Sequence, residues 1–175
     1  VALGAGRNTA LLNEQIRRFR PALVSVGHGA HRAEIAHTDV LTGEQGLVAL
    51  ATHPDVDVVV VATSGKAGLA PTLAALRAGK EVALANKEVL VMAGEIVMAE
   101  ARARGKVIRP VDSEHSALWQ CLQGESPASI ANLILTASGG PFREWDWRRL
   151  AEATIDNALH HPNWSMGKKI TIDSA

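Results

Sequence analysis

Residues 56–90 read VDVVVVATSGKAGLAPTLAALRAGKEVALANKEVL, and this stretch decides the fold. Val56–Val61 is almost entirely valine, which is typical of a parallel strand buried on both faces. Gly68–Ala78 has a helical composition and stops at Gly79, a favourable residue just after a helix. Glu81–Ala85 then predicts a second strand. A strand, a helix and a strand at this spacing predict a βαβ unit with a right-handed crossover.

The same alternation continues on both sides of this unit. Further strands are predicted at Val1–Leu3, Ala22–Val26 and Lys106–Arg109. Three further helices are predicted. The first is capped by Asn8 or Thr9 and has apolar residues at Leu11, Leu12, Ile16 and Phe19. The second starts at Thr42, with Gln45 at capping-box spacing, and the third is Glu88–Arg104, which ends at Gly105. Residues 1–110 are therefore predicted to form a doubly wound α/β domain with a parallel sheet, which binds ligands at the carboxyl ends of its strands.

The pattern changes near Pro110. Loops rich in serine, glycine, proline and tryptophan follow, with one predicted strand at Ile130–Thr136. We predict a second domain over residues 111–175 that builds its site from loops. The chain starts without methionine inside an apparent strand and stops inside a pattern at KKITIDSA, so we expect both ends to be truncations.

Composition narrows the class of protein. The chain of 175 residues is 47% hydrophobic and 21% charged, which allows a sizeable core and argues against disorder. Lys plus Arg and Asp plus Glu both total 18, so no nucleic-acid partner is predicted. No stretch reaches the roughly 18 apolar residues of a membrane span. Cys121 is the single cysteine, which fits a reducing compartment, and its helical context predicts a buried small hydrophobe.

Three loops in the first domain carry candidate binding residues. Gly4–Asn8 offers Arg7 and no acid, which favours the 2′-phosphate of NADP; a plain glycine turn with Asn8 as a helix cap is compatible with that role. Thr63–Gly68 lacks the spacing of a phosphate-binding loop, so an ordinary strand-to-helix turn is favoured. Asn86, Lys87 and Glu88 follow a strand, where ligand contact and helix capping by Asn86 both remain open.

The segment from Asp112 to His115 combines two carboxylates with a serine. In an extended turn, Asp112 and Glu114 would project to the same side and offer the oxygen ligands that Mg²⁺ or Mn²⁺ prefers, with Ser113 free to contact a substrate. The alternative is a helix N-terminus, because Ser113 and Glu114 precede the helical stretch SALWQCL.

Two later segments also have alternatives. Thr136–Phe142 ends a predicted strand in small residues, so Ser138 could donate to a phosphate, or the doubled glycine could form a tight turn. The loop from His160 to Gly167 has the composition of a mobile lid with Trp164 as an aromatic cover, or of a packed loop. His161 alone would more often be structural than catalytic. Trp119, Trp145 and Trp147 are interpreted as packing residues.

Taken together, these segments resemble the 1-deoxy-D-xylulose 5-phosphate reductoisomerase family over essentially the whole chain. The matching strings are AGRN (5–8), LANKE (84–88), PVDSEHSA (110–117), LTASGGPFR (135–143) and HPNWSMGKKITIDSA (161–175), in the order of the family. The resemblance implies conversion of 1-deoxy-D-xylulose 5-phosphate to 2-C-methyl-D-erythritol 4-phosphate by a skeletal rearrangement and a reduction, with NADPH and Mn²⁺ or Mg²⁺ as cofactors. It also implies a Rossmann-like NADPH-binding domain followed by the start of an α+β catalytic domain.

The resemblance assigns a role to individual residues. Asp112 and Glu114 would be metal ligands. Contacts with substrate or its phosphate are implied for Lys87, Ser113, Ser138, His161 and Ser174, with Trp164 and Met166 in a flap. Contacts with the cofactor are implied for Gly6, Arg7, Asn8, Asn86, Glu88 and Gly167. Catalysis is implied for the group Lys87, Ser113, Glu114, Ser138, His161, Trp164 and Ser174.

Relative to the family pattern, we expect the N-terminal glycine-rich loop, a third metal-binding glutamate and the C-terminal part to be missing. We therefore expect the chain by itself to be inactive. The resemblance further implies a cytoplasmic homodimer that acts on a small sugar phosphate. The alternatives are another NADP-dependent oxidoreductase, such as a homoserine-dehydrogenase-like enzyme, and a non-catalytic NADP-binding module.

Overall fold

The computed structural model of the chain describes residues 1–165 and 167–174. The chain forms two compact units, Val1–Ser129 and Ile130–Ala175. No helix in the described part of the chain is long and apolar enough to cross a membrane. The predicted functional boundary between residues 110 and 111 remains a prediction.

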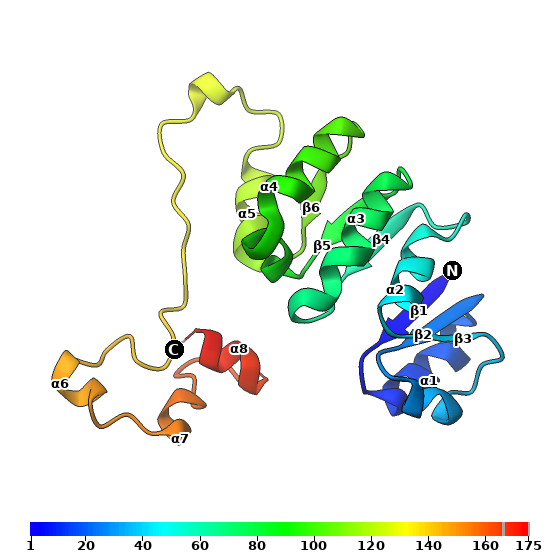
Figure 1. Cartoon of the computed structure of the whole chain (residues 1–175). Helices are drawn as coiled ribbons and strands as arrows, with labels where there is room; N and C mark the ends of the chain where they lie inside the picture. The colour runs from blue at the N-terminus through cyan, green and yellow to red at the C-terminus, as the bar shows by residue number, and fades with distance from the viewer. Residues whose placement is uncertain (166, 175) are drawn as a thin grey trace. The chain divides into compact units, whose positions relative to one another are not determined.

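The first unit contains two parallel sheets of three strands each (Figure 1). One has the order β1 (Ala2–Ala5), β2 (Leu23–Val26) and β3 (Val40–Thr42), and the other has β4 (Val58–Val61), β5 (Glu81–Leu84) and β6 (Ile108–Pro110). Every neighbouring pair is parallel. The predicted α/β class with parallel strands is therefore confirmed, while β3 is a strand that the sequence did not indicate.

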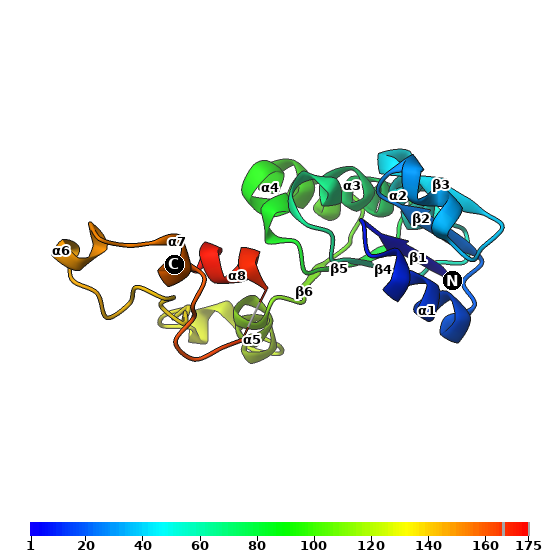
Figure 2. The same ribbon diagram turned by 90° about the horizontal axis from the view of Figure 1, so that it is seen from below.

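Helices connect and cover these strands. They are α1 (Thr9–Phe19), α2 (Gly43–Thr52), α3 (Leu69–Arg77), α4 (Lys87–Ala103) and α5 (Ser113–Cys121), with short 3-10 helices η1 (Gly29–Glu34), η2 (Gly65–Gly68) and η3 (Pro127–Ser129). Figure 2 shows α2, α3 and α4 along one side of the strands and α1 on the opposite side. This arrangement places the loops after β5 and β6 next to each other, because the two strands pair in parallel and Leu84 faces Pro110.

Two apolar clusters form the core of the first unit. One, which includes Leu76, Val82 and Val97, packs β4–β6 against α3 and α4. The other, which includes Leu12 and Val24, packs β1–β3 against α1. Each fully buried aliphatic side chain of this size contributes about 1.5–3 kcal/mol relative to an exposed one.

The helix starts agree with the sequence, but one cap does not. The Asn8 side chain accepts a hydrogen bond from the backbone N–H of Leu11 at 3.1 Å, so Asn8 rather than Thr9 caps α1. Thr42 does precede α2, but its side chain makes no capping bond, so the predicted capping box is absent. The backbone bonds of α2 and its packing against β2 and α3 hold this helix without the box.

The valine-rich strand β4 is buried on one face only. Val61 is buried and Val59 packs against the core, whereas Val58 and Val60 are 52% and 65% exposed. Successive side chains of a strand point to opposite faces, and α3 and α4 cover only one of them. The prediction that Val56–Val61 is buried on both faces is therefore wrong.

A cavity of about 720 Å³ separates the two sheets. It is lined along the whole of β1 and β4 and by α2 residues such as Leu47 and Leu50. Among the described residues, β1 pairs only with β2 and β4 pairs only with β5, so both strands present an unpaired edge.

The second unit contains the short helices α6 (Trp147–Leu150), α7 (Ile155–Ala158) and α8 (Lys168–Asp173). The predicted strand at Ile130–Thr136 is wrong, because no strand is present from residue 130 to 165 or from 167 to 174. Leu133, Ile134 and Leu135 are exposed instead of packed against a neighbouring strand. Cys121 is also exposed, contrary to its prediction, because α5 buries none of its residues.

Candidate functional site

An ion pair joins the carboxyl ends of β5 and β6. Lys87 begins α4 directly after the loop that follows β5, and Asp112 precedes α5 after β6. The Lys87 Nζ lies 3.1 Å from the Asp112 Oδ2, with the two side chains 55% and 23% exposed. The structure thus brings together a predicted substrate contact and a predicted metal ligand that are 25 residues apart in the chain.

The start of α5 determines how Asp112 is presented. Asp112 occupies the N-cap position, yet its side chain makes no capping bond and is available to Lys87. Ser113 and Glu114 lie in the first helical turn, and the Ser113 hydroxyl donates to Glu114 Oε2 at 2.8 Å. The prediction of an extended turn is therefore wrong, because α5 begins at Ser113 itself. The alternative, a helix N-terminus at this segment, is the one that agrees with the structure.

The donor atoms in this region suit a hard cation. Asp112 and Glu114 supply carboxylate oxygens, and Mg²⁺ is commonly held by one or two carboxylates together with water and substrate oxygens. The described residues contain no group of three or more His, Cys, Asp or Glu side chains placed to hold a metal ion. Asp112 and Glu114 therefore offer the donor chemistry that a divalent cation prefers, and their role as its ligands stays a prediction.

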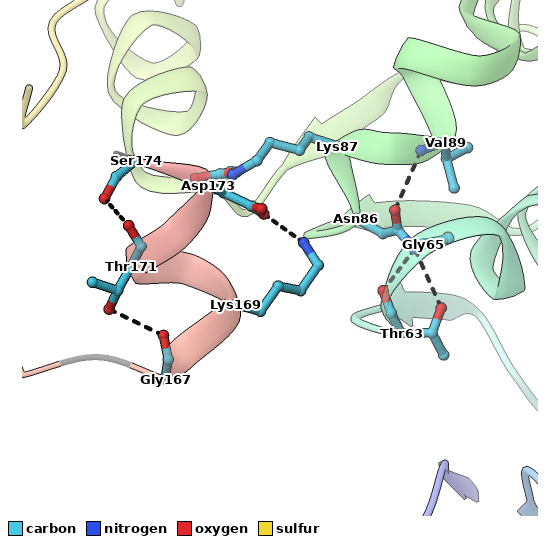
Figure 3. A network of polar contacts seen from close by, with 11 residues as sticks. Thr63, Gly65, Asn86, Lys87, Val89, Gly167, Lys169, Thr171, Asp173 and Ser174 are labelled. Atoms are coloured by element: carbon cyan, nitrogen blue, oxygen red, sulfur yellow. Dashed lines mark hydrogen bonds and ion pairs between the residues drawn. The ribbon is translucent and has the colours of Figure 1, made fainter. Parts of the chain in front are cut away.

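Asn86 organises the loop next to this ion pair (Figure 3). The residue as a whole is 1% exposed. The Nδ2 group donates to the carbonyls of Thr63 at 2.6 Å and Gly65 at 2.9 Å, and Oδ1 accepts from the backbone N–H of Val89 at 3.2 Å. The predicted helix cap is confirmed, and both amide hydrogens are used within the protein.

Gly68 completes this network, although the sequence did not mark it as a site residue. A Cβ at Gly68 would lie 2.5 Å from the Asn86 Nδ2 and 3.0 Å from Val89 Cγ2. Glycine is therefore required for Asn86 to approach the loop after β4. In the sequence, the one signal for this packing was the predicted strand-to-helix turn at Thr63–Gly68, for which an ordinary turn was favoured.

The loop after β1 is exposed. Gly6, Arg7 and Asn8 all lie at the surface. The Gly6 carbonyl accepts from the backbone N–H of Gly27 at 3.1 Å, and Asn8 caps α1. The exposed Arg7 guanidinium carries the positive charge that the predicted contact with a 2′-phosphate needs. Glu88 lies in the first turn of α4, where the helix dipole favours a carboxylate.

In the second unit, the structure brings Ser138 and His161 together. The His161 Nε2 lies 3.1 Å from the Ser138 hydroxyl oxygen, and His161 is a buried residue, 6% exposed. Ser138 precedes Gly139 and Gly140, whose φ values of 80° and 66° require glycine. The Arg143 side chain closes this turn by donating to the Ser138 carbonyl at 3.3 Å.

The end of the second unit forms a short hydrogen-bonded helix (Figure 3). Gly167 is the N-cap of α8, and its carbonyl accepts from the backbone N–H of Thr171 at 3.1 Å and the Thr171 hydroxyl at 3.2 Å. The Ser174 hydroxyl donates to the Thr171 carbonyl at 2.7 Å. Lys169 pairs with Asp173 at 2.6 Å.

The tryptophans of this region differ from one another. Trp145 packs edge-on against Phe142 with ring centroids 4.9 Å apart and beneath the Arg149 guanidinium at 4.0 Å, so its packing role is confirmed. Trp147 is largely exposed, and the packing role predicted for it is wrong, because α6 buries no residue. Trp164 is exposed as well, and Met166 lies outside the described residues.

Comparison with known proteins gives consistent matches. The family model described as 1-deoxy-D-xylulose 5-phosphate reductoisomerase matches residues 1–94, and the one described as its C-terminal domain matches residues 108–175. The reductoisomerase of Anaeromyxobacter dehalogenans is 57% identical over 180 residues, and that of a Synechococcus species is 49% identical over 193 residues. Each alignment covers the whole chain but 46% and 48% of these relatives, so the chain spans about half their length.

Solved structures show the same relationship. A DOX-P reductoisomerase in complex with NADPH, fosmidomycin and magnesium is similar with a TM-score of 0.87 and 39% identity, covering 99% of this chain and 47% of that one. The Zymomonas mobilis reductoisomerase in complex with NADPH has a TM-score of 0.86 and 37% identity, covering 100% of this chain and 46% of that one. These likenesses extend over both compact units.

Proposed function

The chain belongs to the 1-deoxy-D-xylulose 5-phosphate reductoisomerase family, and from this premise we propose that its residues serve the NADPH- and metal-dependent conversion of 1-deoxy-D-xylulose 5-phosphate to 2-C-methyl-D-erythritol 4-phosphate. The enzyme would be an NADP-dependent oxidoreductase with an isomerase step, acting in the synthesis of isoprenoid precursors. The substrate backbone would be rearranged to an aldehyde, and NADPH, when bound, would supply the hydride for its reduction to the product alcohol.

The Lys87–Asp112 ion pair is the observation that carries this proposal. The pair places the Lys87 ammonium group beside the Asp112 carboxylate, where the parallel strands β5 and β6 end. The Asp112 carboxylate makes no capping bond to α5. An ammonium group at this position would bind a substrate hydroxyl or carbonyl oxygen. The carboxylate beside it would hold a cation against the same substrate.

The metal would be held by Asp112 and Glu114, with Mg²⁺ or Mn²⁺ as the preferred ions. When bound, such a cation acts as a Lewis acid that polarises substrate oxygens and keeps them in register. Ser113 would contact the substrate from the first turn of α5. Its present hydrogen bond to Glu114 holds that carboxylate in one orientation.

NADPH would be held by the loops after β1 and β5 together with Gly167, and it would supply the hydride. Arg7 is exposed and would pair with the 2′-phosphate, next to Gly6 and Asn8. Asn86 would act indirectly, since both its amide hydrogens already bind the carbonyls of Thr63 and Gly65. Its effect on the cofactor would be to fix the shape of the loop after β4, while Glu88 would act from the first turn of α4.

The second unit would bind the substrate phosphate through Ser138 and Ser174, with His161 bonded to Ser138. Trp164 is exposed and would cover the bound substrate, which would exclude water from the aldehyde. We also propose a cytoplasmic homodimer, with light scattering in solution as its test. The exposed single cysteine, Cys121, is compatible with a reducing compartment.

The test uses the longest form of the protein that contains these 175 residues. Loss of NADPH absorbance is followed while Mn²⁺ is titrated in the presence of 1-deoxy-D-xylulose 5-phosphate. The Asp112→Asn variant is compared with Glu152→Gln, which alters an exposed carboxylate in the second unit. We expect oxidation to need all three components, to fall by about a hundredfold or more in Asp112→Asn because a charged metal ligand is lost, and to be unchanged in Glu152→Gln.

Other results would replace the proposal. Turnover without a divalent metal would favour a different NADP-dependent oxidoreductase, such as a homoserine-dehydrogenase-like enzyme. Binding of NADPH without metal-dependent turnover would favour a non-catalytic NADP-binding module. Equal activity of Asp112→Asn and the unaltered protein would remove Asp112 from the metal site.

A further inference from the structure

Both ring nitrogens of the buried His161 are engaged, and each serves a different segment. The Nδ1 atom lies 3.1 Å from the backbone nitrogen of Asn163 and 3.1 Å from that of Trp164. The Nε2 atom lies 3.1 Å from the Ser138 hydroxyl oxygen. One imidazole thus connects the glycine turn at Ser138 with the segment that carries Trp164.

These contacts determine where the imidazole proton resides. A backbone N–H can only donate, so the Nδ1 that faces two of them must present its lone pair. A neutral imidazole with an unprotonated Nδ1 carries its hydrogen on Nε2. The Nε2–H therefore donates to the Ser138 oxygen, and the reverse arrangement is excluded by the two backbone donors.

The direction of the Ser138 hydroxyl follows. Because its oxygen accepts from His161, the hydroxyl hydrogen points away from the imidazole. Among residues 1–165 and 167–174, the Ser138 hydroxyl makes no hydrogen bond other than the one with His161. The Ser138 hydroxyl hydrogen is therefore kept away from the imidazole and can be donated to a ligand, as recognition of an anionic oxygen requires.

We propose that His161 is a positioning residue locked in the Nε2–H tautomer, which aims the Ser138 hydroxyl at an anionic oxygen of the ligand and orders the backbone of Asn163 and Trp164 at the same time. The identity of that ligand as a phosphate rests on the proposed function. The tautomer and the ordering of residues 163–164 do not depend on it. Loop order and anion binding are coupled through one side chain that does not itself need to touch the ligand.

Two substitutions separate the two halves of this role. Asn at position 161 keeps an oxygen acceptor near the place of Nδ1 but has no donor that reaches Ser138. Gln at position 161 places its amide donor near the place of Nε2 but leaves the N–H groups of Asn163 and Trp164 without an acceptor. If the His161 side chain only filled space, Asn and Gln at this position would have similar effects on both phosphate binding and loop order.

The experiment uses the whole chain labelled with 15N and inorganic phosphate as the probe. Nitrogen NMR of the unaltered chain should show a protonated Nε2 and an unprotonated Nδ1 on His161. His161→Asn should weaken phosphate binding by roughly threefold to tenfold, because the hydroxyl regains three rotamers and loses a polarising donor. It should leave the amide exchange of Asn163 and Trp164 close to that of the unaltered chain.

His161→Gln should give the opposite result, with phosphate binding retained and amide exchange at residues 163 and 164 accelerated by about tenfold or more. Ser138→Ala serves as the control that removes the anion donor and leaves the amides protected. A protonated Nδ1, or equal losses in both readouts for both His161 variants, would overturn the positioning role. Failure of the unaltered chain to bind phosphate would instead overturn the anion half of the inference and the phosphate subsite in the proposed function, whatever the tautomer.

Discussion

Replacing the buried Asn86 with alanine should strongly destabilise the first unit. The substitution removes three hydrogen bonds, to the carbonyls of Thr63 and Gly65 and from the N–H of Val89. Each contributes about 1 kcal/mol net, and buried groups left without partners add to this, so we expect a loss of about 3–4 kcal/mol. Since whole domains are stable by only about 5–15 kcal/mol, the effect is readily measured.

The assay is equilibrium urea unfolding of the whole chain, followed by the circular dichroism of its helices. With a slope of about 1–3 kcal/mol per molar urea, a loss of about 3–4 kcal/mol should lower the midpoint by roughly 1–4 M. Asn86→Ser is the matched comparison, because serine keeps a cap for Val89 and should recover about 1 kcal/mol relative to alanine. A loss below about 1 kcal/mol for Asn86→Ala would show that water replaces these bonds, and the reasoning from burial would fail.

Two other substitutions test neighbouring features. Gly68→Ala should lower the free energy of unfolding by about 1–3 kcal/mol, because its Cβ would lie 2.5 Å from the Asn86 Nδ2. Most of this loss should vanish when Asn86 is alanine as well. Strictly additive losses in a double-mutant cycle of urea midpoints would contradict the clash. The hydrogen bond from Arg77, aided by that from Arg104, holds the pKa of the Glu100 carboxyl below its ordinary value of 4.5. Because the pKa of Glu100 is lowered on folding, the stabilisation is present above the ordinary value of 4.5 and is lost as the pH falls through the folded-state pKa. Glu100→Gln should therefore reduce the difference between the urea midpoints at neutral and acidic pH, and an unchanged difference would contradict this role of Glu100.

The sequence predicted the local parts of the fold well. The positions of the strands and the helix in the βαβ unit over residues 56–90, and the cap at Asn8, follow from residues that are close in the chain, and both agree with the structure. Burial of Val58 and Val60 failed because it depends on which helices cover each face of the sheet. The strand predicted at Ile130–Thr136 failed for a similar reason, since apolar residues form a strand only beside a partner.

The candidate site divides in the same way. Capping by Asn86 could be predicted from three consecutive residues, but its bonds to Thr63 and Gly65 cross 21 to 23 residues and could not. The Lys87–Asp112 pair likewise depends on the parallel pairing of β5 with β6. The coupling of Ser138 to His161 spans 23 residues, and no spacing rule in the sequence indicates it.

The cavity between β1 and β4 has a consequence for cooperativity. No ladder of hydrogen bonds joins the two sheets among the described residues, and each sheet has its own apolar core. Helix α2 packs on β1 and β2 and also on α3, which itself packs on β4 and β5. Native-state hydrogen exchange of the 175-residue chain should therefore resolve two foldons, the amides of β1–β3 and those of β4–β6, which open with different free energies and are coupled through the packing of α2 on α3.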